Sequence, residues 1–188
     1  MSISACDATS IFEDQRAFFE SGRPRDLSYR QDRLRSLARE LERRSDDALD
    51  SLRDDLGKPA LEAWLAEVHF LQAELKHCLR NLTGWQKPER RRNPFYFWPA
   101  RSEIRREPFG QVLIASPWNY PLQLALSPLL CAVSAGNCVI LKPSELAPAT
   151  AAFLADLVTS VFEPGHVAVI QGGPETGARL LDLPFQFF

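Results

Sequence analysis

The sequence predicts an α/β protein in which a helical N-terminal region precedes a short parallel β-sheet. Charge is the first observation: residues 1–109 hold 20 Lys/Arg and 19 Asp/Glu, and residues 110–188 hold only 2 and 5. The second is that short apolar segments alternate with helical ones after residue 110, a pattern typical of parallel strands covered by helices on both faces. We therefore expect solvated helices first and a buried sheet after them.

The N-terminal half carries three apolar stripes at helical spacing. Apolar residues between Leu34 and Leu56 recur at steps of three, four or seven, and Ser45, which two acids follow, is a helix-start signal. Gly57 and Pro59 predict the end of one helix and the start of the next. The next stripe consists of Leu61, Leu65, Val68, Leu71, Leu75, Leu79 and Leu82.

Residues 88–109 lose the helical period and contain four prolines, so we expect an extended linker with short strands. The Arg90–Arg92 run is compatible with a nucleic-acid patch, but the adjacent Glu89 and the near-neutral helical half favour a solvated linker. The predicted organisation is a helical region over residues 1–87, the linker or strands over 88–109, and a partial NAD(P)-binding α/β domain over 110–188.

Three strands are predicted in the last region, at Val112–Ala115, Val139–Lys142 and Val167–Gln171. Helices are expected over residues 122–135, which Pro128 makes irregular, over residues 148–162, and from Pro174 to about Leu181. This order is that of one mononucleotide-binding half of a doubly wound, Rossmann-like fold.

The predicted sheet is truncated, because a fourth strand would begin only at Leu183–Phe188. In the doubly wound order the first strand is central and pairs with the fourth. We therefore expect strand 112–115 to form an exposed apolar edge that favours self-association. Alternatively, the terminal segment LPFQFF folds back and caps this edge.

Composition excludes several classes of function. A net charge of −2 and a sequence pI near 6.0 give no reason to bind nucleic acid or an anionic membrane. The four cysteines lack CxxC spacing, the N-terminus lacks a signal-peptide pattern and the longest apolar run is too short for a membrane span. A cytoplasmic protein is expected, and the scattered histidines predict no metal site.

The candidate site lies at the carboxyl ends of the predicted strands, where ligands bind in such sheets. Lys142 offers a cation for ribose hydroxyls or phosphate, and Glu145 offers acceptors for a ribose diol, although both also fit ordinary loop charges. The glycines of the segment GGPETG (Gly172, Gly173 and Gly177) let backbone approach a ligand, but this is not the usual G-x-G-x-x-G fingerprint.

The segment FGQVLIASPWNYPLQLALSPLLCAVSAGNCVILKPSELAPAT closely resembles the start of the cofactor domain of the aldehyde dehydrogenase superfamily. The segments DLGKPALEAWLAEV and VIQGGPETG resemble the class 3 branch, so the resemblance covers nearly the whole chain. It implies NAD- or NADP-dependent oxidation of an aldehyde to an acid, through a thiohemiacetal and a thioester. It also implies that the sheet is the first three strands of that cofactor domain.

The resemblance also implies roles for individual residues. Asn119 matches the amide that stabilises the oxyanion, although between two prolines it could merely shape a turn. Lys142 and Glu145 match contacts to the adenosine ribose. The residues that match glycines near the adenine or lie in the loop bordering the cofactor are Gly173, Gly177, Ser116 and Trp118.

The family's nucleophilic cysteine, its general-base glutamate and its pyrophosphate turn are expected downstream of this segment. Cys131 and Cys138 fit buried small apolar residues better than nucleophiles. Two hypotheses follow. In the first, the chain is the cofactor half of an aldehyde dehydrogenase, inactive alone and completed by a C-terminal half. In the second, it is a non-catalytic remnant or interaction module that binds nucleotide weakly at most.

Overall fold

The computed structural model describes residues 5–188, and it is an α/β protein as the sequence predicts. The first half holds α1 (Ala5–Glu20), the 3-10 helix η1 (Arg23–Arg25), α2 (Leu27–Arg43), α3 (Ser45–Leu56), α4 (Ala60–Ala63), the π-helix η2 (Trp64–His69) and α5 (Phe70–Trp85). The second half holds β1 (Glu89–Arg91), the 3-10 helix η3 (Phe95–Phe97), β2 (Ser102–Ile104), β3 (Gln111–Ala115), α6 (Gln123–Ala135), β4 (Cys138–Lys142), α7 (Pro148–Val161), β5 (Val167–Val169) and α8 (Pro174–Leu181).

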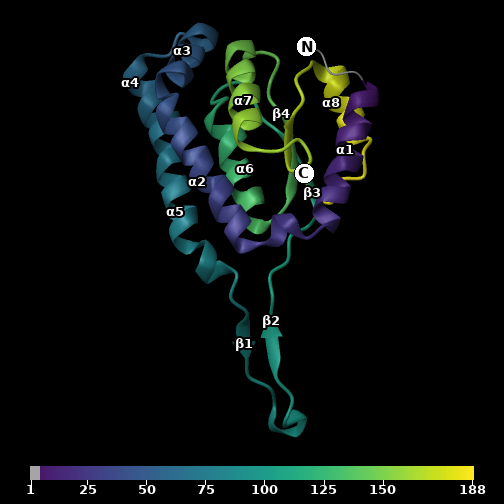
Figure 1. The fold of residues 1–188 in the computed structure, drawn as a ribbon. Coiled ribbons are helices and arrows are strands. Elements are labelled where there is room, and N and C mark those ends of the chain that lie inside the picture. Colours follow the sequence, from purple (N-terminus) through teal and green to yellow (C-terminus); the bar gives the residue numbers. More distant parts are fainter. Residues whose placement is uncertain (1–4) are drawn as a thin grey trace.

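The central sheet has the strand order β3-β4-β5, with all strands parallel. Helices α6 and α7 cover one face, whereas α1 and α8 cover the other (Figure 1). Helices α2, α3 and α5 pack on the outer side of α6 and α7, and one apolar core joins these helices to the sheet. The predicted strands and sheet helices are thus confirmed, whereas the division into ranges 1–87, 88–109 and 110–188 stays a prediction.

The π-helix changes which side chains of the third stripe are buried. An i→i+5 turn adds one residue and so rotates the preceding residues around the helix axis. As a result, Leu61 is 70% and Leu65 51% exposed, and the prediction that they belong to the apolar face is wrong. Ala63 and Glu67 lie on the buried face before Val68 instead.

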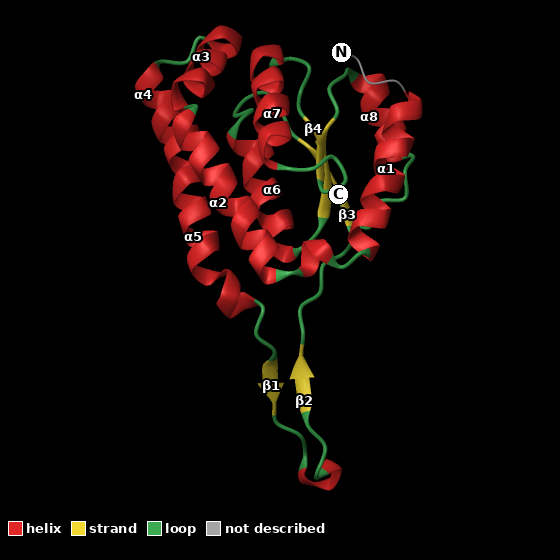
Figure 2. Ribbon diagram, in the orientation of Figure 1, coloured by secondary structure: helices red, strands yellow, loops and turns green. Residues whose placement is uncertain are grey.

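Residues 88–109 form an antiparallel hairpin of β1 and β2 that projects away from the body of the protein (Figure 2). The predicted extended strands are confirmed. The charged side chains at its base pair with one another, since Arg91 and Arg106 both contact the carboxylate of Glu89. Four aromatic side chains at its tip are exposed: Phe95, Tyr96, Phe97 and Trp98.

The terminal segment folds back on the sheet and pairs with the first half of β3. The N–H of Gln186 donates to the carbonyl of Gln111 at 3.1 Å, and the N–H of Leu113 donates to the carbonyl of Phe187 at 3.0 Å. Val112 and Phe187 form an isolated parallel bridge, which is the first step of a fourth strand. The remaining edge, Ile114–Ala115, has no strand partner within residues 5–188.

We expect this remaining edge to favour association, because unpaired N–H and C=O groups and apolar side chains meet there. Sedimentation velocity over a series of concentrations should show the average mass rising with concentration, and a hydrophobic dye should bind. A monomer at every concentration, with no dye binding, would mean that the folded-back tail suffices as a cap.

His166 is the buried titratable group of the core between α1, α2 and the sheet. It is fully buried, its Nδ1 lies 3.2 Å from the hydroxyl of Tyr29, and its Nε2 has no partner. Burial lowers the pKa of His166 from 6.5 to about 4, and the positive charges of Arg33 and Arg23 act in the same direction.

We therefore expect stability to fall as pH falls from 6.5 towards 4. Above 6.5 the imidazole is neutral in both states. Below it the unfolded chain binds a proton that the native state does not bind, which costs about 1.4 kcal/mol per pH unit. Urea midpoints over this window should show that slope, and His166→Gln should flatten it. Equal slopes in both proteins would assign the dependence to other groups.

Candidate functional site

The carboxyl ends of β3 and β4 bring the first predicted site residues together. The N–H of Ser116 donates to the carbonyl of Lys142 at 3.0 Å, which extends the parallel ladder by one residue beyond β3. Both residues are buried. Their side chains therefore start from neighbouring backbone positions at the edge of the sheet where ligands bind in doubly wound folds.

Lys142 and Glu145 form an ion pair at this edge. The Nζ of Lys142 lies 3.0 Å from Oε2 of Glu145 and 3.3 Å from the carbonyl of Pro143. The lysine side chain is 10% exposed and the glutamate side chain 38%. A hydrogen bond from its own N–H and a second from Lys142 lower the pKa of Glu145. The carboxylate is therefore ionised at neutral pH, with Oε1 available as an acceptor.

Ser116 supplies a buried polar atom without a partner. Its Oγ is shielded from solvent and makes no hydrogen bond among the residues that the structure describes. Leaving a hydroxyl in this state costs free energy, because its hydration is lost and not replaced. A hydroxyl so placed is suited to a polar ligand group at the sheet edge.

The glycines that begin α8 differ in what they permit. A Cβ at Gly177 would lie 3.5 Å from Cε of Lys142, so this helix turn packs directly on the lysine stem. A Cβ at Gly173 would meet open space, since no atom lies within 4 Å. At Gly172 a Cβ would lie 2.2 Å from Oγ1 of Thr176, so glycine is required there for packing. The structure thus brings Gly177, and not Gly173, against Lys142.

Trp118 and Asn119 lie farther along the loop that follows β3. Both are exposed, with Trp118 at 51%. The backbone carbonyl of Asn119 accepts a hydrogen bond from Nζ of Lys58 at 3.1 Å. The predicted roles of Asn119, Ser116, Trp118, Lys142, Glu145, Gly173 and Gly177 stay predictions.

Two carboxylates that the sequence analysis did not single out occupy the starts of α6 and α7. Glu67, from η2, accepts from the N–H groups of Leu122 and Gln123 at 2.9 and 3.2 Å. Asp55, from α3, accepts from those of Ala149 and Thr150 at 2.9 and 2.7 Å. Helix N-termini attract phosphate through such free N–H groups. These two helix starts are therefore not available to a phosphate, whereas α8 has no side-chain cap.

The described cysteines are not in the environment of a nucleophile. Burial raises the pKa of Cys138 to about 12, and desolvation also raises the pKa values of Cys78 and Cys131. Cys131 is nevertheless exposed, so the prediction that it is a buried apolar residue is wrong. Cys6 lies in α1 rather than in a loose terminus. Within residues 5–188, no group of three His, Cys, Asp or Glu side chains could hold a metal ion.

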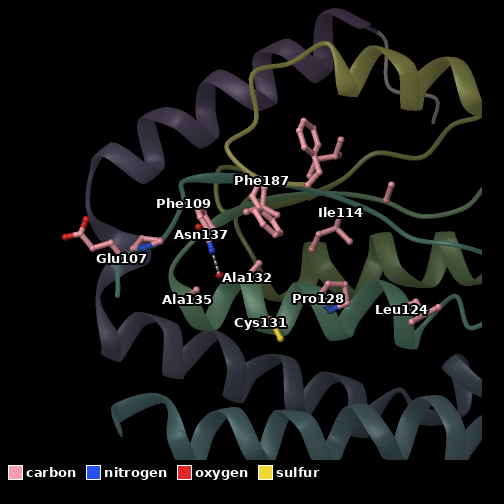
Figure 3. A pocket seen from close by; sticks show the side chains of 15 residues that line it. Glu107, Phe109, Ile114, Leu124, Pro128, Cys131, Ala132, Ala135, Asn137 and Phe187 are labelled. Atoms are coloured by element: carbon pink, nitrogen blue, oxygen red, sulfur yellow. Dashed lines mark hydrogen bonds between the residues drawn. The ribbon is translucent and has the colours of Figure 1, made fainter. Parts of the chain in front are cut away.

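Cys131 faces an apolar groove of about 430 Å³ along the open edge of β3. Figure 3 shows Pro128 and Cys131 of α6 on one side of it and Phe109 and Phe187 on the other. A second cavity, of about 880 Å³, lies between α5 and the base of the hairpin. None of the predicted site residues lines either cavity. No helix of the described chain is both long and apolar enough to cross a bilayer.

Comparisons with known proteins agree with this geometry. The aldehyde dehydrogenase family profile matches residues 2–184. The chain is 38% identical over 176 residues to 4,4'-diaponeurosporen-aldehyde dehydrogenase of Staphylococcus aureus (strain NCTC 8325 / PS 47), covering 94% of this chain and 38% of that protein. It is 41% identical over 172 residues to aldehyde dehydrogenase family 3 member B1 of Bos taurus, covering 92% of this chain and 37% of that one.

Solved structures give the same result for the fold. A substrate-bound Staphylococcus aureus AldH superposes with a TM-score of 0.93 at 37% identity, over 94% of this chain and 39% of that chain. Glyceraldehyde-3-phosphate dehydrogenase GapN of Methanocaldococcus jannaschii, complexed with NADP, superposes at 0.83 with 22% identity, over 95% of this chain and 39% of that one, which supports the fold alone. The chain spans less than two fifths of the length of these relatives.

Proposed function

Because the chain belongs to the aldehyde dehydrogenase family, we propose that it contributes to the NAD(P)-dependent oxidation of an aldehyde to a carboxylic acid. It spans less than two fifths of the family members that it matches, so the complete reaction requires groups beyond those in this chain. Its own contribution is to bind the adenosine end of the cofactor and to supply one oxyanion donor.

The observation that carries this proposal is the cluster of Ser116, Lys142 and Glu145 at the carboxyl edge of the sheet. A ribose diol needs acceptors and donors close together, and the cluster offers Oε1 of Glu145, the ammonium of Lys142 and the unpartnered hydroxyl of Ser116. Gly177 keeps the surface beside Lys142 flat enough for a base to approach. The residues present therefore fit an adenosine moiety.

The pyrophosphate is expected to depend on groups beyond this cluster. Glu67 and Asp55 already occupy the starts of α6 and α7, and a second anion there would be repelled. We therefore expect weak binding, dominated by adenosine. Glu145 disfavours a 2′-phosphate and Lys142 favours it, so the balance between these two side chains sets the preference for NAD or NADP.

Asn119 is proposed to donate to the oxyanion that forms when a nucleophile attacks the aldehyde carbonyl. The bound nicotinamide cofactor supplies the hydride acceptor for this chemistry. An oxyanion donor has no tetrahedral intermediate to stabilise without a nucleophile, and the described thiols are protonated at neutral pH. The chain alone is therefore proposed to be inactive, with a second polypeptide supplying the catalytic cysteine and glutamate.

A second candidate function is a non-catalytic interaction module with at most weak nucleotide binding. The apolar groove beside β3 and the exposed aromatic tip of the hairpin, Phe95–Trp98, favour it, since exposed apolar surface of this kind marks contact sites. A cytoplasmic location remains our expectation for both candidates, and it rests on the free thiols of Cys78, Cys131 and Cys138.

Adenine nucleotides should bind the chain with low affinity, and Lys142→Ala and Glu145→Ala should each weaken that binding by about tenfold, the loss expected for one charged hydrogen bond. Lys142→Ala should shift the preference towards NAD and Glu145→Ala towards NADP. Calorimetric titration with AMP, NAD and NADP measures this, with the exposed Lys76→Ala as the matched control. Identical affinities in all four proteins would remove the cluster from the site.

No aldehyde-dependent formation of NADH or NADPH should occur with the purified chain. Absorbance of the reduced nicotinamide, followed with an aliphatic and an aromatic aldehyde, measures it. Turnover that Asn119→Ala abolishes would show that the chain is catalytically complete, and turnover that Cys131→Ser abolishes would identify the nucleophile.

A further inference from the structure

Lys58 and Glu67 form a buried ion pair beneath the loop that carries Asn119. The Nζ of Lys58 lies 2.5 Å from Oε1 of Glu67. Glu67 is 0% exposed and the Lys58 side chain 11%. Burying two charges is costly, and such a pair persists only where its remaining hydrogen-bonding capacity is also satisfied.

Both partners use that remaining capacity on the same loop. Oε2 of Glu67 accepts from the N–H groups of Leu122 and Gln123, where the loop enters α6. Lys58 donates to the carbonyl of Asn119, and its Nζ lies 3.9 Å from the centroid of the Tyr120 ring, a cation–π distance. The pair thus holds residues 119–123 from beneath at both ends.

The π-helix is what places Glu67 there. Trp64–His69 contains the extra residue that moves Glu67 onto the buried face, next to Val68. In a regular α-helix in phase with α5, this phase change would be lost and the carboxylate would rotate away from α6. A strained i→i+5 turn in the middle of a helix frequently marks a functional requirement, and here it serves the carboxylate.

We propose that Lys58 and Glu67 are positioning residues that hold the Asn119 loop in the geometry required for its oxyanion role. This inference rests on the proposed function of Asn119. Neither residue touches the reacting atoms. Lys58 acts on the backbone of Asn119 itself, and Glu67 acts on Lys58 and on the first turn of α6.

The chain offers a matched control in Asp55. This carboxylate caps α7 through the N–H groups of Ala149 and Thr150, as Glu67 caps α6. It makes no printed contact with residues 116–121, so Asp55→Asn removes the same kind of cap without touching the loop. A merely structural role for Glu67 predicts equal effects of the two substitutions on the Asn119 loop.

The experiment compares the full chain with Lys58→Met, Lys58→Arg, Glu67→Gln and Asp55→Asn. Amide relaxation and hydrogen exchange by NMR report on the backbone at Asn119, Tyr120, Leu122 and Gln123, and thermal unfolding reports on stability. Lys58→Met should loosen Asn119 and Tyr120, and Lys58→Arg should restore them. Glu67→Gln should also make exchange at Leu122 and Gln123 about tenfold faster. Asp55→Asn should speed exchange only at Ala149 and Thr150.

If Lys58→Met or Glu67→Gln fails to fold, the double variant Lys58→Met/Glu67→Gln, which leaves no unpaired charge, takes its place. A loop equally ordered in wild type and in the Lys58 variants, or equally loosened by Asp55→Asn, would overturn the proposal. AMP titration of the same variants separates the two claims. Wild type that fails to bind AMP contradicts the proposed cofactor site, whereas the loop measurements test the positioning role independently of it.

Discussion

The buried carboxylates of Glu67 and Asp55 are the contacts on which the joining of the two halves depends. Each comes from the N-terminal helices, and each satisfies two N–H groups that begin a helix of the sheet layer. Apolar packing between the layers has little directionality, but these hydrogen bonds have a fixed geometry. They set the position of α3 and η2 relative to α6 and α7, and thereby the path of both loops at the carboxyl edge of the sheet.

Periodicity predicted the sheet layer well because each of its elements is buried on a consistent face. The strands around Val139 and the helix over residues 148–162 are apolar enough to be recognised without any partner. Helix α1 was not predicted, since its buried stripe includes Gln15. The amide of Gln15 donates to the carbonyl of Val139 at 2.7 Å, so a polar residue lies where a pattern of apolar residues would require leucine.

The candidate site was predictable in part, and the limit is physical. Ser116, Lys142 and Glu145 follow strands directly, so the rule that ligands bind at strand ends selects them. Lys58 and Glu67 act across 61 and 55 residues on Asn119 and Leu122, and no local pattern encodes such contacts. The π-helix hid Glu67 further, because a regular 3.6-residue period assigns Leu65 to the buried face.

The projecting hairpin has a consequence for how the chain is connected. It is the covalent link between the helical half and the sheet half, yet the two halves share one apolar core, and no residue of η3 is buried. Exposed loop tips tolerate cleavage and insertion because little packed structure depends on them. The tip at Phe95–Trp98 is therefore a natural splitting point: two peptides divided there retain every buried contact between the layers and can reassociate as a heterodimer.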